Sequence, residues 1–163
     1  DTLGFRTNNT TPQVLQDAVT LMAAGAPLAL IMDEVYGHNP LPMMRLWGLA
    51  FSRAVLQDGV LWVELSQQDM AACSANVTHV SGLANFMSTI DEAEVALVLR
   101  EMGDGRIDVS LRSRPRVDVA QVAAALGGGG HPQASGCQLT GTLTESRERV
   151  LATLRQQMVQ PVQ

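Results

Sequence analysis

The chain has 163 residues, of which 46% are hydrophobic, 17% charged and 4% aromatic. These proportions are ordinary for a globular protein of one or two modest domains, and they allow a buried core. The net charge of −5 argues against a general nucleic-acid coat, because such a protein needs a dense footprint of lysine and arginine. A short anionic ligand held by a few local cations remains compatible with this charge.

The two cysteines, Cys73 and Cys137, are too few for a disulfide framework and lack the spacing of a zinc site. We therefore expect reduced thiols in a cytoplasmic protein. No apolar run reaches membrane-spanning length, and no basic region leads into an apolar stretch at the N-terminus. Because the chain begins at Asp1 and not at a methionine, we expect it to be a piece of a longer protein.

Two helical patterns occupy the first forty residues. Thr11 can cap a helix that begins at Pro12 and ends before Gly25. A second, shorter helix is expected to close at Gly37. The turn-rich segment 37–42 has no periodic apolar pattern, so we place the main domain boundary there.

The next stretch mixes helices with a tight hairpin. Apolar residues at helical spacing predict a helix over residues 43–54. The Asp-Gly pair at 58–59 then supplies the turn of a hairpin over residues 54–66. Short helices are expected over residues 67–75 and 82–90.

A second hairpin is predicted around the Gly-Asp-Gly turn at 103–105. Its first strand, from Val95 to Leu99, is apolar on both faces, as a central buried strand would be. Its second strand alternates, so that one face joins the core and the other carries polar groups. The core set is Ile107, Val109 and Leu111, and the polar set is Asp108, Ser110, Arg112 and Arg114.

The remaining patterns predict a helix, a strand and a terminal helix. Asp118 can cap the first helix, which runs to Gly127. A strand is expected over residues 135–143, and a terminal helix follows with Thr144 as its cap. Together the elements predict an α/β fold in which helices flank one mixed β-sheet.

The segment GGGGHPQASG, residues 127–136, departs from these patterns. One glycine suffices to cap the preceding helix, and four exceed that need. A glycine run exposes successive N–H groups, and a concave row of them can bind an anion. It is not a Walker-type phosphate loop, because it lacks the Gly-Lys-Ser/Thr ending and follows a helix. His131 adds a ring N–H that can bond a phosphate.

Arg112 and Arg114 supply cations on one predicted strand face, and the guanidinium fork suits phosphate oxygens. Each feature alone has an ordinary explanation, because exposed arginines are usually solvated and a lone histidine is more often a surface residue. Together with the glycine run they predict a pocket for a terminal phosphate or carboxylate. The carboxylates form no acid–base pair that the sequence can place.

The segment IDVSLRSRPRVDVAQVAAALGGGGHPQASGC, residues 107–137, closely resembles the DHHA1 domain of the DHH phosphoesterase family, in its oligoribonuclease branch. Residues 81–101 resemble the segment that precedes it, and residues 1–26 resemble the stretch that closes the catalytic domain. The resemblance implies that residues 1–40 are the C-terminal remnant of a DHH catalytic domain with its linker. Residues 41–163 would then be a DHHA1 substrate-binding domain.

The resemblance also implies a set of site residues. Asp1 matches a metal ligand of the family's fourth motif. The substrate-binding elements match Arg112, Ser113, Gly128, Gly129, Gly130 and His131. Family members hold two Mn²⁺ ions with Asp-x-Asp and Asp-His-His motifs, which this sequence lacks, and one carboxylate cannot hold a hard divalent ion. We therefore expect this chain alone to bind no Mn²⁺ and to be catalytically inactive.

For the full-length enzyme, the resemblance implies hydrolysis of short oligoribonucleotides (nanoRNA) or adenosine 3′,5′-bisphosphate. Its partners would be these nucleotides, the DHH domain and, as a further possibility, a second copy of the chain. One alternative is a stand-alone nucleic-acid-binding module such as that of alanyl-tRNA synthetase. Another is a phosphodiesterase for cyclic or linear signalling dinucleotides, single-stranded DNA or polyphosphate. The acidic charge disfavours long polymers, and the choice among small substrates stays open.

Overall fold

The computed structural model describes residues 2, 4–7 and 9–158. The chain divides into two compact units, residues 1–40 and 41–163. The first unit contains α1, Pro12–Ala23, and α2, Leu28–Tyr36, and neither helix has a buried residue. Both helices were predicted, and Thr11 caps α1 by accepting a hydrogen bond from the Val14 amide at 3.3 Å. In the described part no single helix could cross a membrane by length and composition, although α1 and α2 pass that test as a pair bent by 113°.

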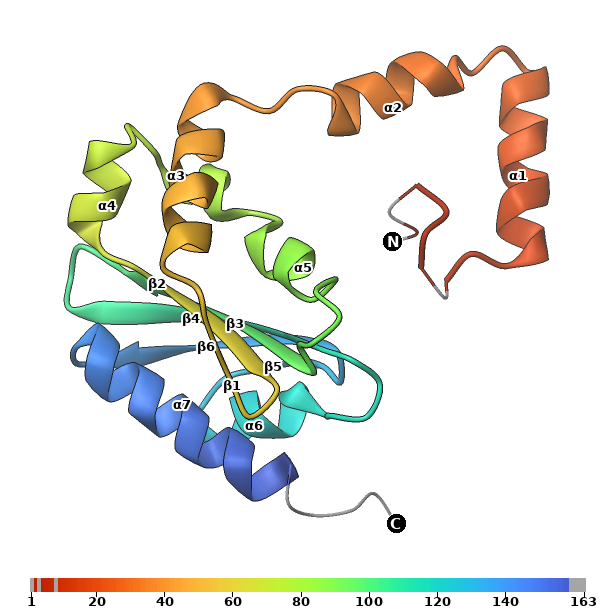
Figure 1. Ribbon diagram of the computed structural model, residues 1–163. Coiled ribbons are helices and arrows are strands. Elements are labelled where there is room, and N and C mark those ends of the chain that lie inside the picture. The colour runs from red at the N-terminus through yellow and green to blue at the C-terminus, as the bar shows by residue number, and fades with distance from the viewer. Residues whose placement is uncertain (1, 3, 8, 159–163) are drawn as a thin grey trace. The chain divides into compact units, whose positions relative to one another are not determined.

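A mixed β-sheet forms the centre of the second unit (Figure 1). Its strands in the described part are β1 Val55–Gln57, β2 Val60–Leu65, β3 Val95–Glu101, β4 Arg106–Ser113, β5 Gly129–His131 and β6 Ala134–Thr140. They lie in the order β1-β2-β3-β4-β6-β5. Only β2 and β3 are parallel among these pairs. The predicted α/β fold with a mixed sheet is confirmed.

Helices lie on both faces of this sheet (Figure 1). One face carries α3 Leu41–Ser52, α4 Gln67–Ala72 and α5 Leu83–Met87. The other carries α6 Val119–Ala125 and α7 Leu143–Met158. A short 3₁₀ helix, η1 Val77–Val80, precedes α5 in the sequence. The chain from β2 to β3 therefore passes over one face only, as the crossover between parallel strands requires.

Successive residues of β3 enter two different hydrophobic cores. Val95, Leu97 and Leu99 pack in the core that α6 and α7 cover, whereas Ala96 and Val98 pack in the core under α3 and α5. The sequence predicted that this strand is apolar on both faces. The structure confirms the prediction, because helices bury both faces of the strand. Each fully buried side chain of this size contributes roughly 1.5–3 kcal/mol. The strand therefore joins the two layers of helices.

The first hairpin has the turn that the sequence predicted. Asp58 and Gly59 both have left-handed backbone angles, with φ of 52° and 76°. A two-residue turn with positive φ at both positions matches the twist of the strands that it joins. The turn therefore fixes the register in which Gln57 faces Val60.

The start of α7 differs from the prediction. The Thr142 hydroxyl accepts a hydrogen bond from the Glu145 amide at 3.2 Å, and a Glu145 carboxylate oxygen accepts one from the Thr142 amide at 2.9 Å. This reciprocal pair is a capping box. The prediction of Thr144 as the cap was wrong, because the helix already begins at Leu143.

A buried carboxylate, Asp69, ties the start of α4 to the residue that follows α3. It accepts hydrogen bonds from the amide and hydroxyl of Ser66 at 2.9 and 2.7 Å, and from Nη1 of Arg53 at 2.8 Å. Burial alone would raise the pKa of Asp69, but the hydrogen bonds from Ser66 and the charge of Arg53 outweigh it and hold the pKa below its usual value. The ionised carboxylate therefore stabilises the folded chain.

Replacing this group by Asp69→Asn should lower the free energy of unfolding at pH 7 by about 1–3 kcal/mol, because a charge-assisted network is lost. The pKa of Asp69 is lower in the folded chain than in the unfolded chain. Its contribution to stability is therefore fully present above the pKa of the unfolded chain and is lost as the pH falls through the pKa of the folded chain. Urea unfolding of the original chain and of Asp69→Asn should therefore show a difference in unfolding free energy that shrinks below about pH 4. Glu92→Gln, at an exposed position, is the charge-matched control. A difference in unfolding free energy that does not change with pH would contradict the stabilising role of the ionised Asp69 carboxylate.

Candidate functional site

Within the described part of the second unit, the face of the sheet that carries α3, α4 and α5 is covered by these helices over β2 and β3, and α5 also contacts β4. No described helix of this unit covers β6 and β5 on that face. We call the part formed by β4, β6 and β5 the open sheet face. Its residues are Asp108, Ser110 and Arg112 of β4, Ala134, Gly136 and Gln138 of β6, and Gly129 and His131 of β5, and none of them is buried. Four of these eight residues are small, namely Ser110, Gly129, Ala134 and Gly136. Little side-chain volume therefore covers the centre of this face.

The register of the three strands brings Arg112 and His131 to this face. Arg112 pairs with Ala134, and Ala134 pairs with His131. Directly paired residues of antiparallel strands have side chains on the same face, so these three form a row across the sheet. The backbones of Arg112 and His131 are about 10 Å apart, which is two strand spacings. The methyl group of Ala134 leaves space between them for an anionic group.

The glycine run does not form the concave row of free N–H groups that we expected. The amides of Gly127 and Gly128 donate to carbonyl groups of the last turn of α6, at 3.1 and 2.8 Å. This is a Schellman cap. Residues 129–131 then form β5, an edge strand that was not predicted. The interpretation as an anion nest was wrong, because the run first ends a helix and then pairs with β6.

Two glycines hold the three strands at close range. At Gly130 the φ angle is 143°, and an added Cβ would lie 2.6 Å from the Ala134 carbonyl oxygen. At Gly136 an added Cβ would lie 2.7 Å from the carbonyl oxygen of Val109 on β4. Contacts this short force the backbone to move. The two glycines therefore contribute by allowing β4, β6 and β5 to pair closely, which sets the positions of Arg112 and His131.

Arg112 is held by Asn85 of α5, a residue that the sequence did not single out. Its Nε donates to the Asn85 side-chain oxygen at 2.5 Å, and its Nη1 donates to the Leu111 carbonyl at 2.8 Å. Burial lowers the pKa of Arg112 from its usual value, although an arginine remains a cation at neutral pH. These two bonds use only part of its five N–H donors. The other donors are available to a ligand.

A cavity of about 210 Å³ opens beside Arg112, between η1, α5 and β4. Its apolar wall is formed by Val77, Val80, Ala84 and Val98, and its polar wall by Asp108, Ser110 and Arg112. The Asp108 carboxylate is partly neutralised by Arg100, whose Nη2 lies 3.3 Å away. An anion is therefore favoured at the Arg112 end, and hydrogen-bond donors of a ligand are favoured at the Asp108 end.

Two residues that the sequence grouped with Arg112 lie elsewhere. The Ser113 hydroxyl donates to the Val117 carbonyl at 2.6 Å and so braces the loop before α6. Arg114 follows the end of β4, donates to the Ile90 carbonyl at 3.2 Å and lies 3.6 Å from Asp91. The expectation that Arg114 shares a strand face with Arg112 was wrong, because β4 ends at Ser113.

Asp1, the expected metal ligand, lies outside the described residues. Within residues 2, 4–7 and 9–158 there is no group of three or more His, Cys, Asp or Glu side chains that could hold a metal ion. A pair of Mn²⁺ ions requires several oxygen or nitrogen ligands for each ion. The side chains of this part of the chain do not fit such a centre.

Comparison with known proteins identifies relatives of the chain. The sequence model of the DHHA1 domain matches residues 69–160, which is more than half of the chain. Over 159 residues the chain is 34% identical to the bifunctional oligoribonuclease and PAP phosphatase NrnA of Thermus thermophilus. This match covers 97% of the chain and 48% of that protein. The chain thus spans about half the length of the curated relative.

Two solved structures share the fold. An exopolyphosphatase-related protein from Bacteroides fragilis superposes with a TM-score of 0.89 at 24% identity, over 95% of this chain and 46% of that one. The pGpG-specific phosphodiesterase PggH of Vibrio cholerae superposes with a TM-score of 0.50 at 14% identity, over 96% of this chain and 55% of that one. At these identities the likeness concerns the fold alone.

The close contact at Gly136 leads to a mutational test. Gly136→Ala should lower the free energy of unfolding by about 1–3 kcal/mol, because the new methyl group pushes β6 away from β4. Gly129→Ala is the matched control: the two glycines are paired across β5 and β6, and an added Cβ at Gly129 meets nothing within 4 Å. Urea unfolding measures both. Equal losses in the two variants would show that the contact with Val109 does not constrain the strands.

Proposed function

This chain belongs to the DHHA1 domain family, and on that premise we propose that it is the substrate-binding part of a phosphoesterase for short oligoribonucleotides or adenosine 3′,5′-bisphosphate. The relative from Thermus thermophilus supports this proposal, because its name gives both activities and its identity extends over 159 residues. The chain spans 48% of that protein, so hydrolysis is proposed for a whole enzyme that includes a DHH catalytic domain.

The observation that carries the proposal is the row of Arg112, Ala134 and His131 on the open sheet face. A terminal phosphate above Ala134 would accept hydrogen bonds from the guanidinium of Arg112 on one side. The imidazole N–H of His131 would donate from the other side. Hydrogen bonds to an ionised acceptor such as a phosphate are about twice as strong as bonds between neutral groups. Two donors from separate strands would therefore fix both the position and the orientation of the phosphate.

The cavity beside Arg112 suits the nucleoside that carries this phosphate. Its valine wall would pack against a base or ribose, while Asp108 and Ser110 can accept hydrogen bonds from hydroxyl or amino groups. The cavity volume of about 210 Å³ is of the order of one nucleoside. The net charge of −5 offers little attraction to a long polyanion. The charge of the chain therefore favours short substrates, and the cavity is large enough for one of their nucleosides.

The role proposed for this chain is binding and orientation. Holding a phosphate with its nucleoside in one geometry presents the scissile bond to a catalytic group at high effective concentration. The activating groups would come from the DHH domain, for which we propose two Mn²⁺ ions, and the described residues provide no such centre. No proton transfer is assigned to His131.

Substitution of Arg112 tests the proposed role directly. Arg112→Gln should weaken binding of a 5′-phosphorylated diadenosine by about tenfold or more, because a charge-assisted bond to phosphate is lost. Arg114→Gln removes the same charge from a residue outside the open sheet face and should leave affinity within about twofold. Isothermal titration calorimetry measures both.

The same titrations separate the alternative ligands. Tighter, salt-sensitive binding of a tRNA-sized RNA would favour a nucleic-acid-binding module, because contacts to many phosphates release counterions. Tighter binding of the linear dinucleotide pGpG would favour a signalling dinucleotide as the substrate. Equal weakening by Arg112→Gln and Arg114→Gln would overturn the assignment of the site.

A hydrolysis assay tests the division of labour. The chain alone, incubated with Mn²⁺ and the same dinucleotide, should release no mononucleotide above a protein-free blank, because the described residues hold no metal centre. Product is followed by ion-exchange chromatography. Turnover that is removed by a chelator and absent from a mock purification would contradict the proposed role.

A further inference from the structure

A second pocket lies on the other face of the sheet, between the β1–β2 hairpin and α7. Its volume is about 240 Å³. Two of its lining residues, Val60 and Trp62, belong to the core that α6 and α7 cover, whereas Arg112 projects from the opposite face. The sheet therefore separates this pocket from the candidate functional site. We call it the hairpin pocket.

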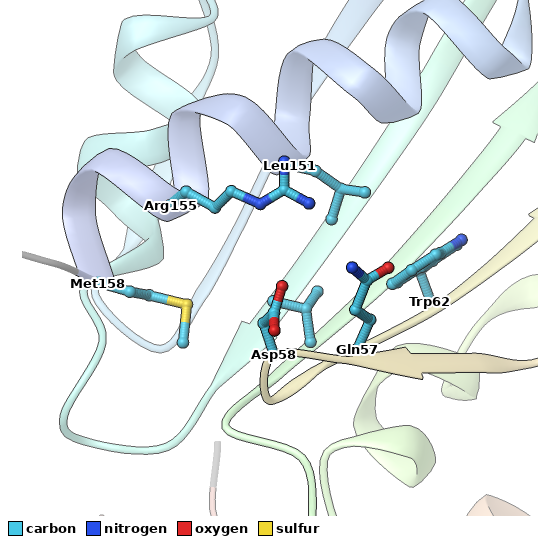
Figure 2. A pocket seen from close by; sticks show the side chains of 7 residues that line it. Gln57, Asp58, Trp62, Leu151, Arg155 and Met158 are labelled. Atoms are coloured by element: carbon cyan, nitrogen blue, oxygen red, sulfur yellow. The ribbon is translucent and has the colours of Figure 1, made fainter.

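The hairpin pocket has a mainly apolar interior. Figure 2 shows Leu151 descending from α7 toward the hairpin, with Trp62 at one end and Met158 at the other. An indole favours stacked or edge contacts with an aromatic ligand. The Met158 sulfur makes favourable contacts with ring edges. An aromatic ring in this space could therefore contact both the Trp62 indole and the Met158 sulfur.

Three polar side chains surround this interior without partners. The amide of Gln57, the carboxylate of Asp58 and the guanidinium of Arg155 form no hydrogen bond or ion pair with any residue that the structure describes. Figure 2 shows Arg155 on the α7 side and the other two on the hairpin side. By contrast, Arg147, two turns earlier on α7, is paired with Glu64 at 3.1 Å. All three residues are exposed to solvent, and they line the pocket from two sides, with Asp58 on the hairpin and Arg155 on α7.

We propose that the hairpin pocket binds a purine nucleoside monophosphate. The base would lie against Trp62 and Leu151, and the phosphate would accept hydrogen bonds from Arg155. Asp58 and Gln57 would meet the edge of the base. Guanine is preferred, because its N1–H and N2–H₂ groups are adjacent donors that one carboxylate can accept together, whereas adenine offers no such pair.

This site is independent of the proposed function, since it shares no residue with the open sheet face. A ligand in the hairpin pocket would contact β1, β2 and α7 only. It can therefore be bound at the same time as a substrate beside Arg112. Its occupancy would stabilise the packing of α7 on the hairpin, because a ligand that binds only the folded state adds to its stability.

The test is a titration of the chain with guanosine monophosphate, followed by calorimetry and tryptophan fluorescence. Arg155→Gln should weaken binding by about tenfold or more. Arg149→Gln removes the same charge from the same helix outside the pocket and should change affinity by less than about twofold. Asp58→Asn should narrow the preference for guanosine over adenosine monophosphate. The fluorescence change should persist in Trp47→Phe and vanish in Trp62→Phe.

Several outcomes would overturn the proposal. The first is the absence of saturable binding at millimolar guanosine monophosphate. The second is an equal loss of affinity in Arg155→Gln and Arg149→Gln. The third is equal affinity for inorganic phosphate and for the nucleotide. Loss of guanosine monophosphate binding in Arg112→Gln would place the nucleotide on the open sheet face instead. That result would reject the hairpin pocket and leave the proposed function intact. Thermal unfolding of each variant establishes that it is folded.

Discussion

The candidate site depends on the antiparallel pairing of β4 with β6, which runs from Arg106 opposite Thr140 to Arg112 opposite Ala134. A slip of one residue would turn every side chain of β4 to the other face, so that Arg112 would point into the core and Leu111 into water. Burial of Ile107, Val109 and Leu111 prevents such a slip. The hydrophobic core thus sets the position of the Arg112 guanidinium in the candidate site. The absence of a side chain at Gly136 allows β6 to lie close to Val109 of β4.

The sequence predicts most of the fold because its apolar patterns are local. The alternation along β4 predicted which face Arg112 occupies, and the Asp-Gly turn at 58–59 predicted the first hairpin. The residues it missed depend on contacts far apart in the chain. The glycine run indicated a helix cap at Gly127, which the positive φ of 83° at that residue confirms. The run has no side-chain pattern, so strand β5 could not be predicted from it. Asn85 reaches Arg112 only because α5 packs beside β4, and nothing at its own position signals that.

The two faces of the sheet carry different chemistry. On the open sheet face Arg112 is held by an amide from a covering helix and lies in line with His131, beside a cavity of nucleoside size. On the other face the hairpin pocket offers an apolar interior with unpaired charged groups at its rim. Neither place provides a group of side chains that could hold a metal ion among the described residues. We propose binding for both places, and hydrolysis for a DHH domain of the whole enzyme.

The central claim is that a short phosphorylated nucleotide binds on the open sheet face. The most direct measurement is a nuclear magnetic resonance titration of the isotope-labelled chain with 5′-phosphorylated diadenosine. The account predicts the largest shifts at the Arg112 Nε–H, the Asn85 side-chain amide and the His131 ring, with little change along α4. Shifts confined to residues away from β4, β5 and β6, or none at saturating nucleotide, would contradict it.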